Sequence, residues 1–212
     1  GVDIVIDKLD SNDKARLDLL VKNITYYLKK SGVKYVDESI VRKFIDAKLD
    51  TVPKLLNATN EDFMKVDGFK DRMAFKIYTN IQNSIKKIKL STLMAASNLF
   101  GPGLGEKKLT FITNEHPDIL DKKLTKTQMI ELISDIDGFS TKTSTGFAEG
   151  LIDFKKFLKK IPNVQFESKK RKLSKNPKFE GMKIVFSGFR NKEWNEIIED
   201  CGGKVTNTVS KN

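Results

Sequence analysis

Apolar residues recur at helical spacing along most of the first 160 positions. Over residues 13–30 they fall three or four positions apart, at Leu17, Leu20, Val21, Ile24, Tyr27 and Leu28. This spacing places them on one face of an α-helix, and the pair Ser31-Gly32 is a typical helix end. A shorter helix is expected at about 39–48, where the inward positions are Ile40, Val41, Phe44 and Ile45. The pattern predicts a mainly helical structure.

A longer pattern repeats within this helical part. The letters VDGF at 66–69 return as IDGF at 136–139, and an earlier pair, 33–39 and 101–107, is similarly spaced. Each DG turn follows a short helix with a threonine N-cap, Thr59 or Thr125. Each precedes a long helix whose apolar stripe we interpret as core: Met73, Ile77, Ile81, Ile85 and Ile88, then Phe147, Leu151, Phe154, Leu158 and Ile161. We interpret the repeat as a tandem duplication of a unit with two turns, each between two helices.

The character of the chain changes after Pro162. Residues 163–178 are polar and basic without apolar periodicity, which is typical of a linker. Residues 182–189 have the composition of a strand. A helix through Trp194, Ile197 and Ile198 is expected next, Gly202-Gly203 would end it, and a second strand would begin at 204. The expected divisions are a remnant of a preceding domain (1–12), two helical repeats (13–89 and 90–162), the linker, and a short α/β portion (179–212).

The charge favours a polyanionic partner. The 212 residues include 39 Lys and Arg against 28 Asp and Glu, a formal net charge of +11. A basic surface of this kind is typical of nucleic-acid binding, although it also occurs in proteins that are merely basic and soluble. Only five of the basic residues are arginine. Lysine attracts phosphate without the bidentate geometry that reads bases, so binding independent of base sequence is favoured.

The sequence gives little support for a disulfide, a metal site, a histidine general base or a membrane span. The single cysteine, Cys201, cannot form an internal disulfide or a cysteine-rich zinc site, and we expect it to be a small buried apolar group. The only histidine, His116, lies in a turn-like stretch and is expected to be a loop residue rather than a metal ligand or general base. No apolar run approaches the length of a membrane span.

The turns are the candidate binding elements. A glycine at the start of a helix lets the backbone approach a phosphate oxygen, and the free N–H groups and the helix dipole favour the anion. The turn at 33–39 has no glycine and carries Asp37 and Glu38, so we expect it to pack rather than bind. The predicted DNA-binding residues are Gly68, Phe69, Lys70, Arg72, Gly101, Gly103, Gly105, Lys107, Lys108, Gly138, Ser140, Thr141 and Lys142.

These turns resemble helix-hairpin-helix motifs, four in two pairs, in the order found in the C-terminal region of NAD-dependent DNA ligases. Residues 58–87 and 91–109 are similar to the corresponding family stretches, and residues 179–212 resemble the opening half of a BRCT domain. The family places a four-cysteine zinc module before the hairpins, and this chain has none there. In this respect it resembles the zinc-lacking, often viral members. The resemblance implies a mainly α fold with tandem hairpin pairs followed by a short α/β BRCT portion.

The letters KVDG at 65–68 match the adenylation signature of DNA ligases, in which a lysine attacks a nucleotide phosphorus. We do not assign that role to Lys65. The second copy of the turn carries Asp135 at this position, and no strand-rich segment surrounds the lysine, so hairpin geometry accounts for the DG pair. We therefore predict no catalytic residue, metal site or bound cofactor in this chain.

The expected function is sequence-independent binding of nicked duplex DNA by part of a ligase whose adenylation domain uses NAD. The alternative is a DNA-repair scaffold with hairpins and a BRCT domain but no catalysis. The missing start methionine and the end within a strand favour the fragment. The basic run at 169–172 is either an import signal, an additional DNA contact or a solvated linker. Ser187-Gly188 in the BRCT portion is structural or binds a phosphorylated protein partner. The expected setting is intracellular, in the nucleus or a viral replication compartment.

Overall fold

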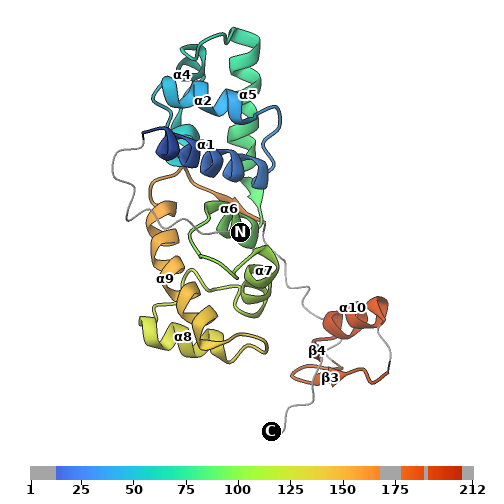
Figure 1. Ribbon diagram of the computed structural model, residues 1–212. Coiled ribbons are helices and arrows are strands. Elements are labelled where there is room, and N and C mark those ends of the chain that lie inside the picture. Colours follow the sequence, from blue (N-terminus) through green and yellow to red (C-terminus); the bar gives the residue numbers. More distant parts are fainter. Residues whose placement is uncertain (1–12, 168–177, 189–190, 207–212) are drawn as a thin grey trace. The chain divides into compact units, whose positions relative to one another are not determined.

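The structure is a computed structural model, and it describes residues 13–167, 178–188 and 191–206. The chain divides into two compact units, residues 1–167 and 168–212, and each is described by itself (Figure 1). The predicted remnant at 1–12 and the basic run at 169–172 lie outside the described residues.

The first unit is mainly helical, as predicted. Its first half contains α1 (Asp13–Lys30), α2 (Glu38–Asp46), α3 (Val52–Asn57), α4 (Asn60–Met64) and α5 (Asp71–Ser84). Its second half contains β1 (Lys86–Ile88), α6 (Leu90–Ser97), α7 (Glu106–Glu115), α8 (Lys126–Ser134), α9 (Thr141–Leu158) and β2 (Gln165–Phe166).

The predicted threonine caps are present at both short helices. Thr59 caps α4 and exchanges hydrogen bonds with Asp62, and Thr125 does the same with Gln128 at α8. These reciprocal bonds satisfy backbone donors that the first helical turn leaves without partners. A similar signal at Thr51, which accepts a hydrogen bond from the Lys54 N–H, starts α3. Helix α3 was not predicted from the sequence.

The predicted apolar stripes form the core, with corrections at their ends. Ile77 and Ile81 of α5 are buried, and so are Phe147, Leu151 and Phe154 of α9. Met73 is instead 37% exposed. Helix α5 ends at Ser84 with Ile85 as its C-cap, and Lys87 beyond it has a left-handed φ of 56°. Ile88 therefore lies in β1 rather than on the helix.

The C-terminal ends of α5 and α9 lead into two short strands that pair in parallel (Figure 1). The Gln165 N–H donates to the Ile85 carbonyl at 3.2 Å, and the Glu167 N–H donates to that of Ile88 at 3.0 Å. The start of the predicted linker therefore belongs to the first unit. Its two-residue strand was too short to produce a recognisable apolar alternation.

The second unit has the predicted order of elements. Strands β3 (Lys183–Val185) and β4 (Lys204–Thr206) pair in parallel and are joined by α10 (Lys192–Asp200). Gly202 ends the helix with a φ of 83°. Ile198 is buried at 8% exposure, whereas Trp194 and Ile197 are each more than half exposed. Cys201 is half-buried rather than fully buried, and it is the C-cap residue of α10.

Gly150 of α9 allows a close approach to the loop after α6. A Cβ at this position would lie 2.7 Å from the Leu99 carbonyl oxygen and 2.8 Å from the Phe100 Cα. Because backbone atoms cannot move aside cheaply, we expect Gly150→Ala to lower the free energy of unfolding by about 1–3 kcal/mol. Urea unfolding of the full chain measures this change.

Gly146, one turn earlier on α9, is the matched control. Its added Cβ would meet the Leu104 Cδ1 at 3.6 Å, an ordinary contact. Alanine is favoured over glycine inside a helix by roughly 1 kcal/mol, so Gly146→Ala should leave stability unchanged or raise it. Equal losses in both variants would contradict the close packing at Gly150.

Candidate nucleic-acid interface

Four turns in the first unit share one backbone geometry. Each has a residue with positive φ, then an apolar residue that packs inward, then the N-cap of the following helix. The positive-φ residues are Tyr35, Gly68, Gly103 and Gly138, with φ of 65°, 74°, 82° and 81°. The apolar residues are Val36, Phe69, Leu104 and Phe139, and the N-caps are Asp37, Lys70, Gly105 and Ser140. The turns thus present four helix N-termini in the same way.

The second and fourth turns match closely at a spacing of 70 residues. The Phe69 N–H donates to the Val66 carbonyl at 3.0 Å, and the Phe139 N–H donates to that of Ile136 at 3.1 Å. The Phe69 side chain is buried and its ring centroid lies 6.0 Å from that of Phe44. Phe69, a predicted DNA-binding residue, therefore anchors its turn in the core. Its ring is not exposed to a ligand.

The helix N-termini differ in how they are capped. Asp37 places a carboxylate at the start of α2 and accepts a hydrogen bond from the Ile40 N–H. Ser140 caps α9 through a long hydrogen bond of 3.4 Å from the Thr143 N–H. The N-caps of α5 and α7, Lys70 and Gly105, make no side-chain cap hydrogen bond within the part of the chain that the structure describes. The N–H groups of α5 and α7 are thus the best placed to receive an external anion.

Most of the other predicted residues lie at the surface of the turns. The exposed ones are Gly68, Lys70, Arg72, Gly101, Gly103, Gly105, Lys107, Gly138, Ser140, Thr141 and Lys142. A Cβ added at Gly103 or Gly105 would meet no heavy atom within 4 Å. Lys108 is half-buried, and its ammonium lies 5.6 Å from the centroid of the Phe139 ring. This contact joins the third turn to the fourth.

One acidic residue, Glu106, stands among the cations at the start of α7. Its carboxylate accepts hydrogen bonds from Lys30 at 2.7 Å and from the Thr92 hydroxyl at 2.6 Å. The hydrogen bond from Lys30, followed by that from Thr92, holds the pKa of Glu106 below its ordinary value. The carboxylate is thus neutralised by α1 and turned toward α1 and α6. Its repulsion of an anion at the α7 N-terminus is reduced accordingly.

The sequence analysis missed two residues beside the second turn. Tyr35, at the tip of the first turn, is 62% exposed, and the Lys76 ammonium lies 3.4 Å from its ring centroid. Together with Gly68, Lys70, Arg72, Met73 and Ile77 they line a surface pocket of about 520 Å³, here called the Tyr35 pocket. The first and second turns therefore lie side by side, a placement that periodicity along the chain does not reveal.

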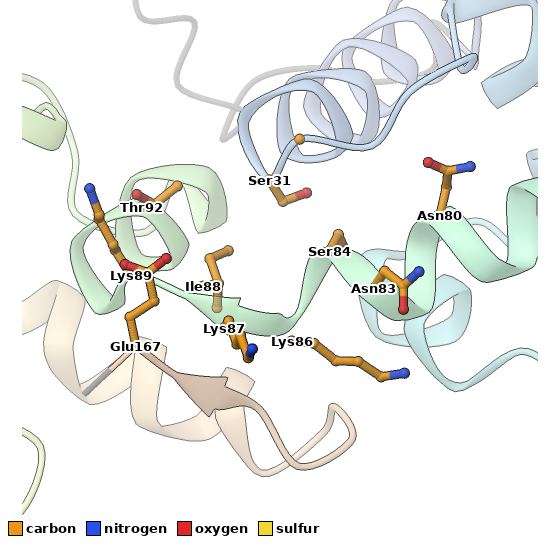
Figure 2. Close-up of a pocket in the computed structure, with 11 residues that line it drawn as sticks. Ser31, Asn80, Asn83, Ser84, Lys86, Lys87, Ile88, Lys89, Thr92 and Glu167 are labelled. Carbon is orange, nitrogen blue, oxygen red and sulfur yellow. The ribbon is translucent and has the colours of Figure 1, made fainter. Parts of the chain in front are cut away.

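A second pocket, of about 390 Å³, lies where the two halves of the first unit meet. Figure 2 shows Lys86 and Lys89 extending toward opposite sides of it, with Asn80, Asn83 and Ser84 along one wall. Lys86 follows the C-terminal end of α5, where positive charge balances the negative end of the helix dipole, whereas Lys89 is the N-cap of α6.

Lys65 does not occupy a nucleotide pocket. It caps the C-terminal end of α4, and its ammonium lies 3.1 Å from the Asp62 carboxylate on an exposed surface. Asp135 holds the same position at the end of α8. The surroundings of Lys65 therefore do not fit an adenylated lysine. The KVDG letters belong to the turn between α4 and α5.

The remaining residues considered for a chemical role lie at a helix end or after a strand. His116 caps the end of α7, in keeping with the prediction of a loop residue. Ser187 and Gly188 follow β3, and both are exposed. Among the residues with described positions, no group of three metal-ligating side chains comes together. No helix there has the length and apolar character needed to cross a membrane.

Three known proteins that are similar to this chain match it over nine-tenths or more of its length. A DNA ligase of Acanthamoeba polyphaga mimivirus is 36% identical over 215 aligned positions, covering 100% of this chain and 33% of the viral protein. DNA ligases of Thermosipho africanus and Campylobacter lari are 29% and 24% identical over 90% and 93% of the chain. The relatives of this chain are DNA ligases. The chain spans about a third of the length of each of the three.

The second unit has its own match. Residues 174–212 match the family model of the BRCA1 C Terminus (BRCT) domain. This agrees with the predicted BRCT portion and with the observed β3–α10–β4 order. No solved structure matches the chain. The resemblance inferred from the turns and the BRCT segment is thus supported by relatives that include a viral ligase.

The ion pair between Lys30 and Glu106 should make a pH-dependent contribution to stability. Because the pKa of Glu106 is lowered on folding, its contribution is present above the ordinary value of 4.5 and is lost as pH falls through the folded value. We expect Glu106→Gln to lower the free energy of unfolding by up to about 1 kcal/mol near neutral pH, since both groups are partly exposed. Urea unfolding at several pH values measures the difference.

The difference between Glu106→Gln and the unchanged chain should vanish in acid. Glu131→Gln serves as the control because that carboxylate is exposed on α8, and its effect should stay within about 0.5 kcal/mol at every pH. A Glu106 effect that persists unchanged at pH 3 would show that the ion pair is not its source.

Proposed function

We propose that the first unit binds duplex DNA without reading its base sequence. The observation that carries the proposal is the start of α7. There, exposed Gly103 and Gly105 precede a helix N-terminus that has no side-chain cap among the described residues. Backbone N–H groups at such an end can donate to phosphate oxygens, and the helix dipole favours their negative charge. Lys107 and Lys108, in the first turn of α7, add positive charge.

The other glycine turns offer the same chemistry. At α5 the donors are accompanied by Lys70 and Arg72, and at α9 by Lys142 and the hydroxyls of Ser140 and Thr141. Phosphate contacts set the position of a protein on DNA but carry no base information. We propose that these are tandem helix-hairpin-helix pairs, related by a pseudo-twofold axis, whose turns contact both strands across a minor groove. The abundance of lysine over arginine supports such sequence-independent contacts.

The similarity to DNA ligases supports a role for this chain in the sealing of nicked DNA. Proteins named DNA ligase match the full chain, and a ligase must hold the two ends of a nicked strand on their template. We propose that this chain is the C-terminal DNA-holding region of an NAD-dependent ligase and that an adenylation domain, which these residues do not form, carries the chemistry. Within this chain no residue is assigned a catalytic step, and Lys65 is a hairpin residue.

Gly105 gives the sharpest test because aspartate is a favoured N-cap. Gly105 has an ordinary φ of −68°, and an added Cβ meets nothing within 4 Å. Gly105→Asp should therefore fold at least as well as the unchanged chain while placing a carboxylate where the phosphate would bind. We expect affinity for a 20-base-pair duplex to fall at least tenfold, measured by fluorescence anisotropy at low salt.

The matched control is Gly105→Asn, which has nearly the same shape without the charge. It is also a good N-cap, and we expect its affinity to stay within about threefold of the unchanged chain. Thermal unfolding of both variants checks that the fold is intact. Equal duplex affinity for the Asp and Asn variants would refute a phosphate contact at the α7 N-terminus.

The salt dependence of binding tests the number of phosphates. Each neutralised phosphate lowers the logarithm of the binding constant by about 0.9 per unit of log salt concentration. Three turns with at least one phosphate each predict a slope of about −2.7 or steeper. Titrations of two duplexes of unrelated sequence should give the same slope and similar affinities. A shallow slope, or strong preference for one duplex, would exclude binding through backbone phosphates alone.

A further inference from the structure

Tyr35 has an unusual backbone conformation for its residue type. Its φ of 65° lies in the left-handed region, at the position where the other three turns carry glycine. A bulky side chain is strained there, because its Cβ approaches the following carbonyl. Glycine would serve the turn without this strain. The fold of the turn therefore does not explain the presence of a tyrosine.

Packing does not explain it either. The neighbouring Val33 and Val36 are buried and anchor the turn, whereas Tyr35 is 62% exposed. Within the described part of the chain, the ring or ionic contact of the exposed ring is with Lys76, whose ammonium lies 3.4 Å from the centroid. An aromatic side chain that is strained and mostly exposed is better explained by contact with a ligand.

The Tyr35 pocket has the composition of a nucleotide site. Met73 supplies apolar surface above the buried Ile77, and Lys70, Arg72 and Lys76 supply positive charge. Among the described residues, no ion pair joins these three cations to a carboxylate. Asp67 and Asp71 lie nearby in the chain. Asp67 is paired with Lys43 at 3.8 Å. The volume of about 520 Å³ lies within the range of small-molecule sites.

We propose that the Tyr35 pocket binds an unstacked nucleobase of a DNA strand, such as one at a strand end or in a single-stranded segment. The base stacks on the exposed surface of the Tyr35 ring, and the adjoining phosphates pair with Lys70 and Arg72. An interior base of a duplex cannot occupy the pocket, because both of its faces are covered by neighbouring bases. The proposal deepens the proposed function: Gly68, in the same pocket, belongs to a turn assigned to the DNA backbone.

Tyr35→Gly tests the proposal without risk to the fold, because glycine relieves the left-handed strain. The full chain is titrated with a fluorescein-labelled 12-nucleotide oligo(dT) and, separately, with a blunt 20-base-pair duplex. Base–aromatic stacking accounts for about fivefold to more than a hundredfold in affinity. We expect Tyr35→Gly to weaken oligo(dT) binding at least tenfold and duplex binding less than threefold. Tyr35→Phe, which keeps the stacking surface, should bind both probes within twofold of the unchanged chain.

The proposal would be overturned by unchanged oligo(dT) affinity in Tyr35→Gly, by an equal loss for both probes, or by absence of oligo(dT) binding in the unchanged chain. A loss in Tyr35→Phe as large as in Tyr35→Gly would also overturn it, since the hydroxyl rather than the ring would then make the contact. Gly105→Asp separates this result from the proposed function. That variant should lose duplex binding and keep most oligo(dT) binding. The duplex contact at α7 and the base contact at the Tyr35 pocket can therefore be refuted separately.

Discussion

The geometry of the four turns is the constraint on which the first unit depends. A residue with positive φ reverses the chain, so that the next apolar side chain packs inward and the following residue starts a helix. Val36, Phe69 and Leu104 are buried in this way. If the reversal failed, the apolar residue would lose its place in the core, and the N–H groups of the next helix would no longer face outward. Stability and the proposed DNA binding thus depend on one backbone feature.

The four turns combine this geometry with different chemistry. Asp37 fills the α2 N-terminus with its own carboxylate, which satisfies the donors internally and disfavours a second anion. The α5 and α7 N-termini have no such side chain in the described structure. At the first turn, where the backbone donors are occupied, the exposed group is instead the ring of Tyr35. The same turn geometry therefore exposes main-chain donors in some turns and a side chain in another, and these are the groups proposed to contact DNA.

Features encoded locally could be predicted from the sequence. The capping boxes at Thr59 and Thr125, the end of α1 at Ser31-Gly32, and the order of elements around α10 follow from neighbouring residues and are present. Features that depend on distant segments could not. The pairing of β1 with β2, the ion pair of Glu106 with Lys30, and the approach of Tyr35 to Lys76 join residues 41 to 79 positions apart. The spacing of apolar residues along the chain does not indicate which distant segments come into contact.

DNA is expected to contact the first unit at its glycine turns, and amide NMR shifts on titration with a nicked duplex measure this directly. The largest shifts should fall at the starts of α5, α7 and α9, with the α2 start and the Lys86–Lys89 segment changing little. Large shifts confined to that lysine segment, with none at the three glycine turns, would contradict the account.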